Sequence, residues 1–187
     1  IKPVIYLQHG TIGMKRIGYT GKYYNNNMFR FFMYNKKIIE QYQKENDFKS
    51  YQLYYAKYHA RYKELIKKQE EFLKDKKQKQ ILWFLTWREY LGKNKETSKL
   101  IKIIKEIVND PKLNKFLKEN NYKFKICVHQ FFDANIIANI MKKDNENIEI
   151  AYQKNVNVMD ELAKSDVLIT DYSSVGFDFT FLNKPVI

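Results

Sequence analysis

The chain has 187 residues, of which 44% are hydrophobic and 29% charged, an ordinary composition for a globular protein with a buried core. Its single cysteine excludes an intramolecular disulfide, and no stretch approaches the roughly 20 uninterrupted apolar residues of a membrane-spanning helix. The 34 lysines and arginines against 21 acidic residues give a net charge of +13, which points to a negatively charged partner unless the lysines only reflect genome composition.

The amino-terminal part of the chain predicts a short strand and a long basic helix. Residues 4–7 form an apolar, β-rich run that opens into a polar loop, as a buried strand does. Residues 47–79 carry apolar side chains near helical spacing, with lysines and glutamates between them. The lysine-rich end of this helix is the expected boundary, so we predict one part over residues 1–76 and a second over residues 77–187.

Strands and helices alternate through the second part. We expect strands at 80–85, 124–128, 148–152 and 167–170. We expect helices at 98–108, 111–119, 134–141, 157–164 and 174–182. This alternation favours an α/β fold, a Rossmann-like parallel sheet with helices on both faces. Ligands of such sheets bind beyond the carboxyl ends of the strands.

Polar side chains cluster at these predicted strand ends. His9 follows the first predicted strand, and Thr11 and Lys15 lie in the same loop, where a hydroxyl and a cation can bind an anionic group. Arg88 follows another strand and suits bidentate phosphate binding. His129 follows a third; its imidazole can act as a general base, donate to a phosphate oxygen, or serve only the structure.

The segment from 165 to 178 is the most informative. An apolar strand runs into Thr170, Asp171 and two serines, after which a helix is expected. Ser173 is a natural N-cap, and the free N–H groups that follow it can bind a phosphate or diphosphate. Asp178 lies one turn beyond Ser174 on the same helix face. Its carboxylate can accept a hydrogen bond from a sugar hydroxyl, or simply stabilise the first turn of a capped helix.

Several classes of site and partner are disfavoured. One cysteine and three scattered histidines lack the spacing of a metal site, and the sequence has neither a P-loop nor a GxGxxG motif, so we expect no metal and no cofactor. Cys127 falls inside a predicted strand and should be a buried, inert thiol. Aromatic platforms and other RNA-binding patterns are absent from the sequence, which argues against a nucleic-acid partner.

Four segments resemble motifs of the CDP-glycerol glycerophosphotransferase family of teichoic-acid polymerases and primases, in the family's order. They are SDVLITDYSSVGFDFTFLNKPVI at 165–187, QHGTIGMKRIG at 8–18, ILWFLTWRE at 81–89 and KICVHQF at 125–131. The second resembles an HGT-x-x-K loop, the third a strand ending in PTxR, and the fourth a strand ending in His-Pro. Leu85 and Gln130 stand where the family usually has proline.

The resemblance implies a two-domain, glycosyltransferase-B-like fold whose second part, residues 77–187, binds the nucleotide donor, while residues 1–76 belong to the acceptor side. It implies that His9 and His129 are the functional histidines, with His9 the better candidate for the base. It gathers four side chains around the CDP-linked donor: Arg88, Ser173, Ser174 and Asp178. Because the chain stops where a strand begins, at 185–187, we expect a piece of a longer protein.

The expected reaction is transfer of glycerol-phosphate, or a related polyol-phosphate, from a CDP-polyol to the terminal hydroxyl of a teichoic-acid-like or capsular polymer, with release of CMP. The acceptor would be lipid-linked or polymeric, at the cytoplasmic face of the plasma membrane. The basic charge and the aromatic-rich stretch at 23–34 suit anionic lipid headgroups. The alternative is a glycosyltransferase of the same fold that uses a nucleotide sugar in surface polysaccharide synthesis.

Overall fold

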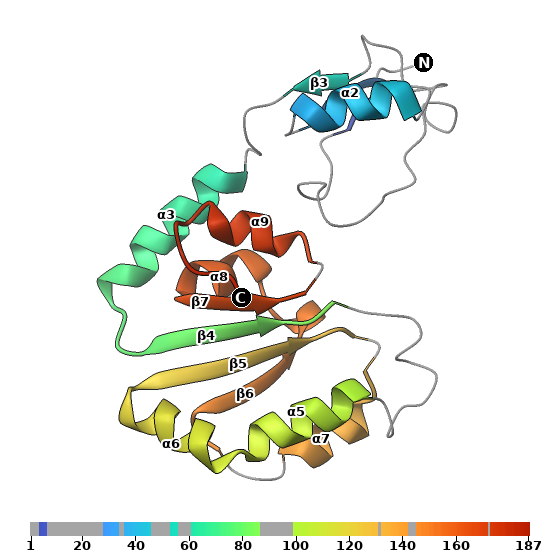
Figure 1. Ribbon diagram of the computed structural model, residues 1–187. Coiled ribbons are helices and arrows are strands. Elements are labelled where there is room, and N and C mark those ends of the chain that lie inside the picture. Colours follow the sequence, from blue (N-terminus) through green and yellow to red (C-terminus); the bar gives the residue numbers. More distant parts are fainter. Residues whose placement is uncertain are drawn as a thin grey trace. The chain divides into compact units, whose positions relative to one another are not determined.

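The chain divides into two compact units. The computed structural model describes residues 4–6, 28–33, 36–45, 53–55, 61–86, 99–130, 132–141, 145–171 and 173–187. Their contacts separate Ile1–Glu64 from Leu65–Ile187 (Figure 1). The division falls within helix α3 (Arg61–Lys74), whereas we expected it just after this helix. Leu65 explains the shift, because it is fully buried in the core of the second unit.

The first unit contains a three-stranded parallel sheet in the order β1-β2-β3. The strands are β1 (Val4–Tyr6), β2 (Met28–Met33) and β3 (Leu53–Tyr55), and helix α2 (Lys36–Glu45) lies between the last two in the sequence. The strand predicted at 4–7 is confirmed. The helix predicted from residue 47 is wrong at its start, since Leu53 and two tyrosines, which favour extended backbone, form β3.

The second unit is built on a four-stranded parallel sheet in the order β6-β5-β4-β7. Its strands are β4 (Lys79–Phe84), β5 (Tyr122–Val128), β6 (Ile148–Tyr152) and β7 (Val167–Thr170). Val186 pairs in parallel with Leu168, so the terminal segment lies along the free edge of β7. All four predicted strands are confirmed: β6 and β7 have the predicted bounds, and β4 and β5 differ by one or two residues at their ends.

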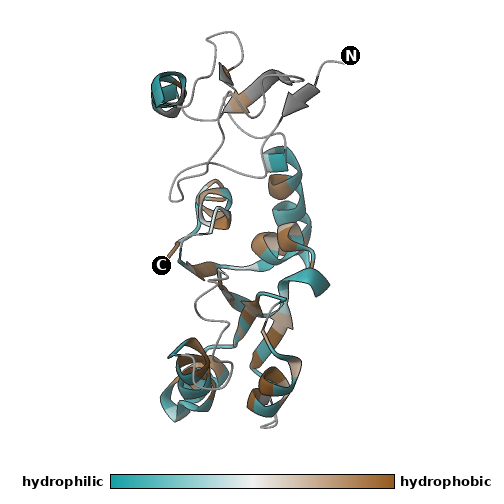
Figure 2. Ribbon diagram, turned by 90° about the vertical axis from the view of Figure 1, so that its right-hand side faces the viewer, coloured by the Kyte–Doolittle hydropathy of each residue, from teal (hydrophilic) through white to brown (hydrophobic). Residues whose placement is uncertain are grey.

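Helices follow the strands as the alternation predicts. They are α5 (Lys99–Asn109), α6 (Pro111–Glu119), α7 (Ala134–Met141), α8 (Val158–Lys164) and α9 (Val175–Thr180), with a 3-10 turn η2 (Gln153–Asn155) after β6. In Figure 2 these helices carry both apolar and polar residues, as helices with one buried face do. The sheet with helices on both faces confirms the predicted α/β class.

The pleat of β5 divides the apolar residues into two cores. Phe124 and Ile126 face α5, α6 and α7, where they pack in a cluster that includes Ile104. Cys127 faces the opposite side, in a second cluster with Phe179 of α9 and residues of α3 and α8. Successive residues of a strand point to opposite faces, so one strand serves both cores. As predicted, Cys127 is a buried thiol, and burial raises its pKa to about 12.

A buried ionic network ties the amino-terminal half of this sheet to α8. Lys125 of β5 donates to Glu161 Oε1 at 3.0 Å and is paired with Glu149 at 2.9 Å, and Gln80 of β4 donates to Glu161 Oε2 and to Ser165 Oγ. Lys125 is 8% exposed and Glu161 6%. Burial opposes the charge on Lys125, but the two carboxylates outweigh it and raise the pKa of this lysine above its ordinary 10.5.

We expect Glu161→Ala to lower the free energy of unfolding of this unit by about 3 kcal/mol, because it leaves Lys125 buried with part of its counter-charge removed. Urea titration measures the loss. The matched control is Glu119→Ala, which removes an exposed partner of Lys115 at 3.8 Å and should cost well under about 1 kcal/mol. Equal losses in the two variants would contradict a stabilising role for the buried pair.

The network also predicts how stability varies with pH. Burial opposes the charge on Glu149, but Lys123 and Lys125 outweigh it and lower the pKa of this carboxylate, so its contribution holds above its ordinary value of 4.5 and is lost as pH falls through the lowered value. The contribution of Lys125 holds below 10.5 and is lost as pH rises through its raised pKa. The difference between wild type and Glu161→Ala should therefore stay constant from about pH 5 to about pH 9.

Candidate functional site

The carboxyl ends of the parallel strands of the second unit lie at one edge of its sheet, called here the carboxyl edge (Figure 1). Two of the described candidate groups follow strands there directly: His129 after β5, and Asp171 after β7. Four other predicted site residues lie outside the described residues: His9, Thr11, Lys15 and Arg88. The carboxyl edge is thus the part of the predicted site that the structure describes.

Thr170 and Asp171 join the ends of β7 and β4. The Thr170 hydroxyl donates to Phe84 O at 2.8 Å, and Asp171 Oδ1 accepts from Thr86 N at 3.2 Å. The last ladder pair of these strands is Phe84 with Thr170, so the two bonds extend the strand pairing past its end. Both side chains therefore hold the backbone of the carboxyl edge in place.

Thr86 is a further polar residue at the carboxyl edge, which the sequence analysis did not single out. Its hydroxyl oxygen is buried, and among the described residues it has no hydrogen-bond partner. A buried hydroxyl without a partner is costly, and such groups are found where a polar contact is still to be made. The signal for it in the sequence was its place in the Thr-Trp-Arg run after a strand.

His129 stands at the start of a tight turn between β5 and α7. Its carbonyl accepts from Phe132 N at 3.1 Å, and the Tyr152 hydroxyl donates to Phe132 O at 3.4 Å from the end of β6. Asp133 then accepts from Asn135 N at the start of α7. Partial burial lowers the pKa of His129 below its ordinary 6.5, so the imidazole is neutral at pH 7. A neutral ring holds one N–H donor and one acceptor.

Helix α9 begins one residue later than predicted. Ser174, not Ser173, occupies the N-cap position; its side chain makes no cap bond, while Ser173 Oγ accepts from Val175 N at 3.5 Å. The helix has six residues, so its macrodipole is small. Asp178 is only 2% exposed. This burial favours its interpretation as a structural residue of the first turn.

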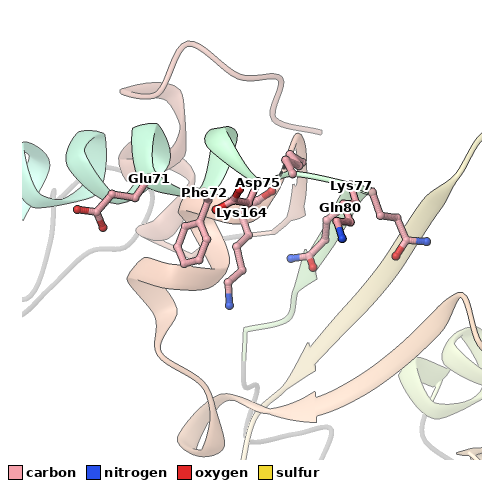
Figure 3. A pocket seen from close by; sticks show the side chains of 8 residues that line it. Glu71, Phe72, Asp75, Lys77, Gln80 and Lys164 are labelled. Atoms are coloured by element: carbon pink, nitrogen blue, oxygen red, sulfur yellow. Dashed lines mark hydrogen bonds between the residues drawn. The ribbon is translucent and has the colours of Figure 1, made fainter.

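The second unit also has a cavity of about 440 Å³ at the opposite end of its sheet (Figure 3). Its lining comes from the last turns of α3, the segment that joins α3 to β4, the start of β4 and the last residue of α8: Glu71, Phe72, Asp75, Lys76, Lys77, Gln78, Gln80 and Lys164. Lys76 Nζ is paired with Asp166 at 2.6 Å and donates to Lys164 O at 2.7 Å. None of the candidate site residues that the structure describes lines this cavity, and its Lys76 is already paired with Asp166.

Two further properties of the described residues bear on the class of site. Across the described residues, no group of three or more His, Cys, Asp and Glu side chains is placed to hold a metal ion. No helix in the described part of the chain is both long enough and apolar enough to cross a membrane.

The relatives found among known proteins are named for the synthesis of teichoic acids. The chain is 32% identical over 126 residues to the teichoic acid glycerol-phosphate primase of Bacillus subtilis (strain 168), covering 67% of this chain and 29% of the relative. It is 30% identical over 169 residues to the teichoic acid poly(glycerol phosphate) polymerase of Bacillus spizizenii (strain ATCC 23059 / NRRL B-14472 / W23), covering 88% and 38%. The chain therefore spans well under half the length of these curated relatives.

The fold resembles that of the wall teichoic acid polymerase TagF, with a TM-score of 0.64 at 22% identity over 97% of this chain and 48% of that one. Solved structures of TagF include a variant soaked with CDPG. Residues 26–187 match the family described as CDP-glycerol:poly(glycerophosphate) glycerophosphotransferase. Since this match takes in the whole second unit, including the carboxyl edge, the chain belongs to the CDP-glycerol:poly(glycerophosphate) glycerophosphotransferase family.

Proposed function

We propose that the protein transfers glycerol-phosphate from CDP-glycerol to the terminal hydroxyl of a teichoic-acid-like polymer and releases CMP. The observation that carries this proposal is the family match over residues 26–187, which includes every described residue of the carboxyl edge. Two relatives that align with the chain are named for glycerol-phosphate polymer synthesis, one a primase and one a polymerase. Capsular polymers are another class of acceptor to which the same transfer reaction would apply.

The proposed mechanism is a displacement at the β-phosphorus of the donor. A new bond forms between this phosphorus and the acceptor hydroxyl oxygen, the bond to the bridging oxygen breaks, and CMP leaves. His9 takes the hydroxyl proton, and Arg88 neutralises charge on the phosphates. His129, neutral at pH 7, donates its N–H to a phosphate oxygen. Phosphoryl transfer depends mainly on such positioning and charge stabilisation.

The donor-side residues of the proposal differ in how they would act. Ser173 and Ser174 lie at the start of α9, where their hydroxyls can reach a ligand at the carboxyl edge. Thr170 and Asp171 would act chiefly by fixing the ends of β4 and β7, and Thr86 offers the donor a buried hydroxyl. The Leu65–Ile187 unit would thus bind the CDP moiety, and the first unit would serve the acceptor, in a glycosyltransferase-B-like arrangement.

The direct test is CMP release by the full-length protein, with a membrane fraction as acceptor. CDP-glycerol and CDP-ribitol are compared with a UDP-sugar at equal concentration. Release of CMP from a CDP-polyol, dependent on acceptor, supports the proposal and identifies the polyol. Turnover of the UDP-sugar alone would instead indicate a glycosyltransferase that uses a nucleotide sugar.

We also propose that the enzyme acts at the cytoplasmic face of the plasma membrane, on a lipid-linked or polymeric acceptor. The net charge of +13 supports this, because anionic headgroups attract basic surfaces by about 1 kcal/mol per cation near the membrane. Cosedimentation with phosphatidylglycerol vesicles should be strong at low salt and weak at about 0.5 M salt, where charge interactions are screened. Equal pelleting with neutral vesicles would contradict an electrostatic attachment.

A further inference from the structure

Gln153 links three strands at the carboxyl edge. It is the first residue of η2, directly after β6, and its side-chain amide crosses to both neighbouring strands. Nε2 donates to Leu85 O at 2.6 Å, just past β4, and to Cys127 O at 3.3 Å, one residue before the end of β5. A glutamine amide has two N–H donors, so one side chain can serve both carbonyls.

These bonds stand where the regular strand pairing stops. The last ladder pair of β4 and β5 joins Phe84 to Cys127, and one further bond runs from Leu85 N to Cys127 O at 3.1 Å. Leu85 is only 4% exposed, so its carbonyl has little access to water. Gln153 supplies a side-chain donor to Leu85 O beyond the last ladder pair, at the point where β4 and β5 end.

The two carbonyls lie next to the candidate reacting groups. Leu85 directly precedes Thr86, whose N–H binds Asp171, and Cys127 is two residues before His129. The neighbouring Tyr152 donates to Phe132 O, on the far side of the turn that begins at His129. The end of β6 therefore holds the backbone on both sides of His129 and the backbone that leads into Thr86.

We propose that Gln153 is a positioning residue, which sets the separation between Thr86 and His129 for the transfer reaction. This inference rests on the proposed function, because it assigns Gln153 to the same site. Its Nε2 is engaged with two backbone carbonyls, so the amide acts on the reaction through the strands it joins. Loss of its two hydrogen bonds lets the ends of β4 and β5 shift relative to each other.

The test compares two glutamines of the same sheet in the full-length enzyme. Gln153→Leu removes the donors at the carboxyl edge while keeping a similar side-chain volume. Gln80→Leu is the matched control, because Gln80 Nε2 also makes two hydrogen bonds, to Glu161 Oε2 at 3.2 Å and Ser165 Oγ at 2.8 Å, but at the opposite end of β4. Urea titration first establishes the stability that each variant loses.

We expect Gln153→Leu to lower kcat/KM for CMP release by about tenfold or more, since displacements of about an ångström at a reacting centre have effects of this size. Gln80→Leu, folded under the same conditions, should stay within about twofold of wild type, since it leaves the positions of the reacting groups unchanged. Equal losses of kcat/KM in the two variants, or an unchanged value in folded Gln153→Leu, would overturn the proposal.

A second measurement is independent of the donor. Hydrogen exchange of the full-length protein, followed by mass spectrometry, reports on peptides covering 82–86 and 126–130. Gln153→Leu should speed exchange in both peptides, and Gln80→Leu should not speed it at their carboxyl ends. If wild-type protein releases no CMP from any donor, the proposed function fails, yet the exchange data still decide whether Gln153 holds the strand ends. Identical exchange in the two variants would refute that role.

Discussion

His129→Ala should lower kcat/KM for CMP release by about 100-fold, in the range found when a group that acts directly on the transferring atoms is removed. His129 directly follows β5, at the edge where ligands of parallel sheets bind, and burial lowers its pKa so that the ring is neutral at pH 7. Alanine leaves the backbone turn to Phe132 intact, because that bond uses the His129 carbonyl. The assay is acceptor-dependent CMP release at saturating and subsaturating donor.

The informative control is His129→Asn, which keeps an N–H donor but cannot titrate near neutral pH. If His129 donates to a phosphate oxygen, the asparagine variant should retain about a tenth of wild-type kcat/KM, well above the alanine variant. Equal activities of the two variants would exclude the donor role and favour a proton-transfer role. Wild-type activity in His129→Ala would exclude His129 from the site altogether.

Phe179→Ala should lower the free energy of unfolding of the second unit by about 4 kcal/mol, the usual cost of emptying a fully buried aromatic position. Phe179 of α9 is 0% exposed and lies in the core shared by α3, α8 and the sheet. Its ring also lies under the Lys184 ammonium, 5.8 Å from the ring centre. Alanine removes the ring and leaves a cavity that the surrounding strands and helices can fill only partly.

Phe181→Ala is the matched control, since it removes the same side chain two residues later, where the phenylalanine is 39% exposed. It should cost less than about 1 kcal/mol. Both variants are compared by urea titration. Because the chain has two compact units, the titration is monitored through a signal that comes from the Leu65–Ile187 unit alone. Similar midpoints for the two variants would show that α9 contributes little to this core.

The second unit could be predicted from sequence because its strands are short apolar runs separated by helices with clear periodicity. Residues 148–152 and 167–170 are strands with the predicted bounds. Beyond its first strand, the first unit could not be predicted, since residues 23–37 mix aromatics, asparagines and lysines with neither helical nor strand periodicity. Leu53 fits the apolar position of a helix and of a strand equally well, and only its partner strand β2 decides between them.

The carboxyl edge was predictable for a topological reason, whereas the partners of its side chains were not. His129 and Asp171 could be assigned to one edge because parallel strands end together. That Thr170 donates to Phe84, or that Asp178 is buried, depends on contacts between residues far apart in the sequence. Gln153 belongs to no motif, and its two bonds exist only once β4, β5 and β6 lie side by side.

Because the sequence has a single cysteine, the reactivity of its thiol can report how often the folded core around it opens. Cys127 is fully buried between β4 and β6, and its pKa of about 12 keeps it protonated in the folded sheet. An alkylating reagent at pH 8 can therefore modify it only in molecules whose core between the sheet and helices α3, α8 and α9 has opened. The rate of modification then measures how often this core opens under native conditions, without an engineered cysteine.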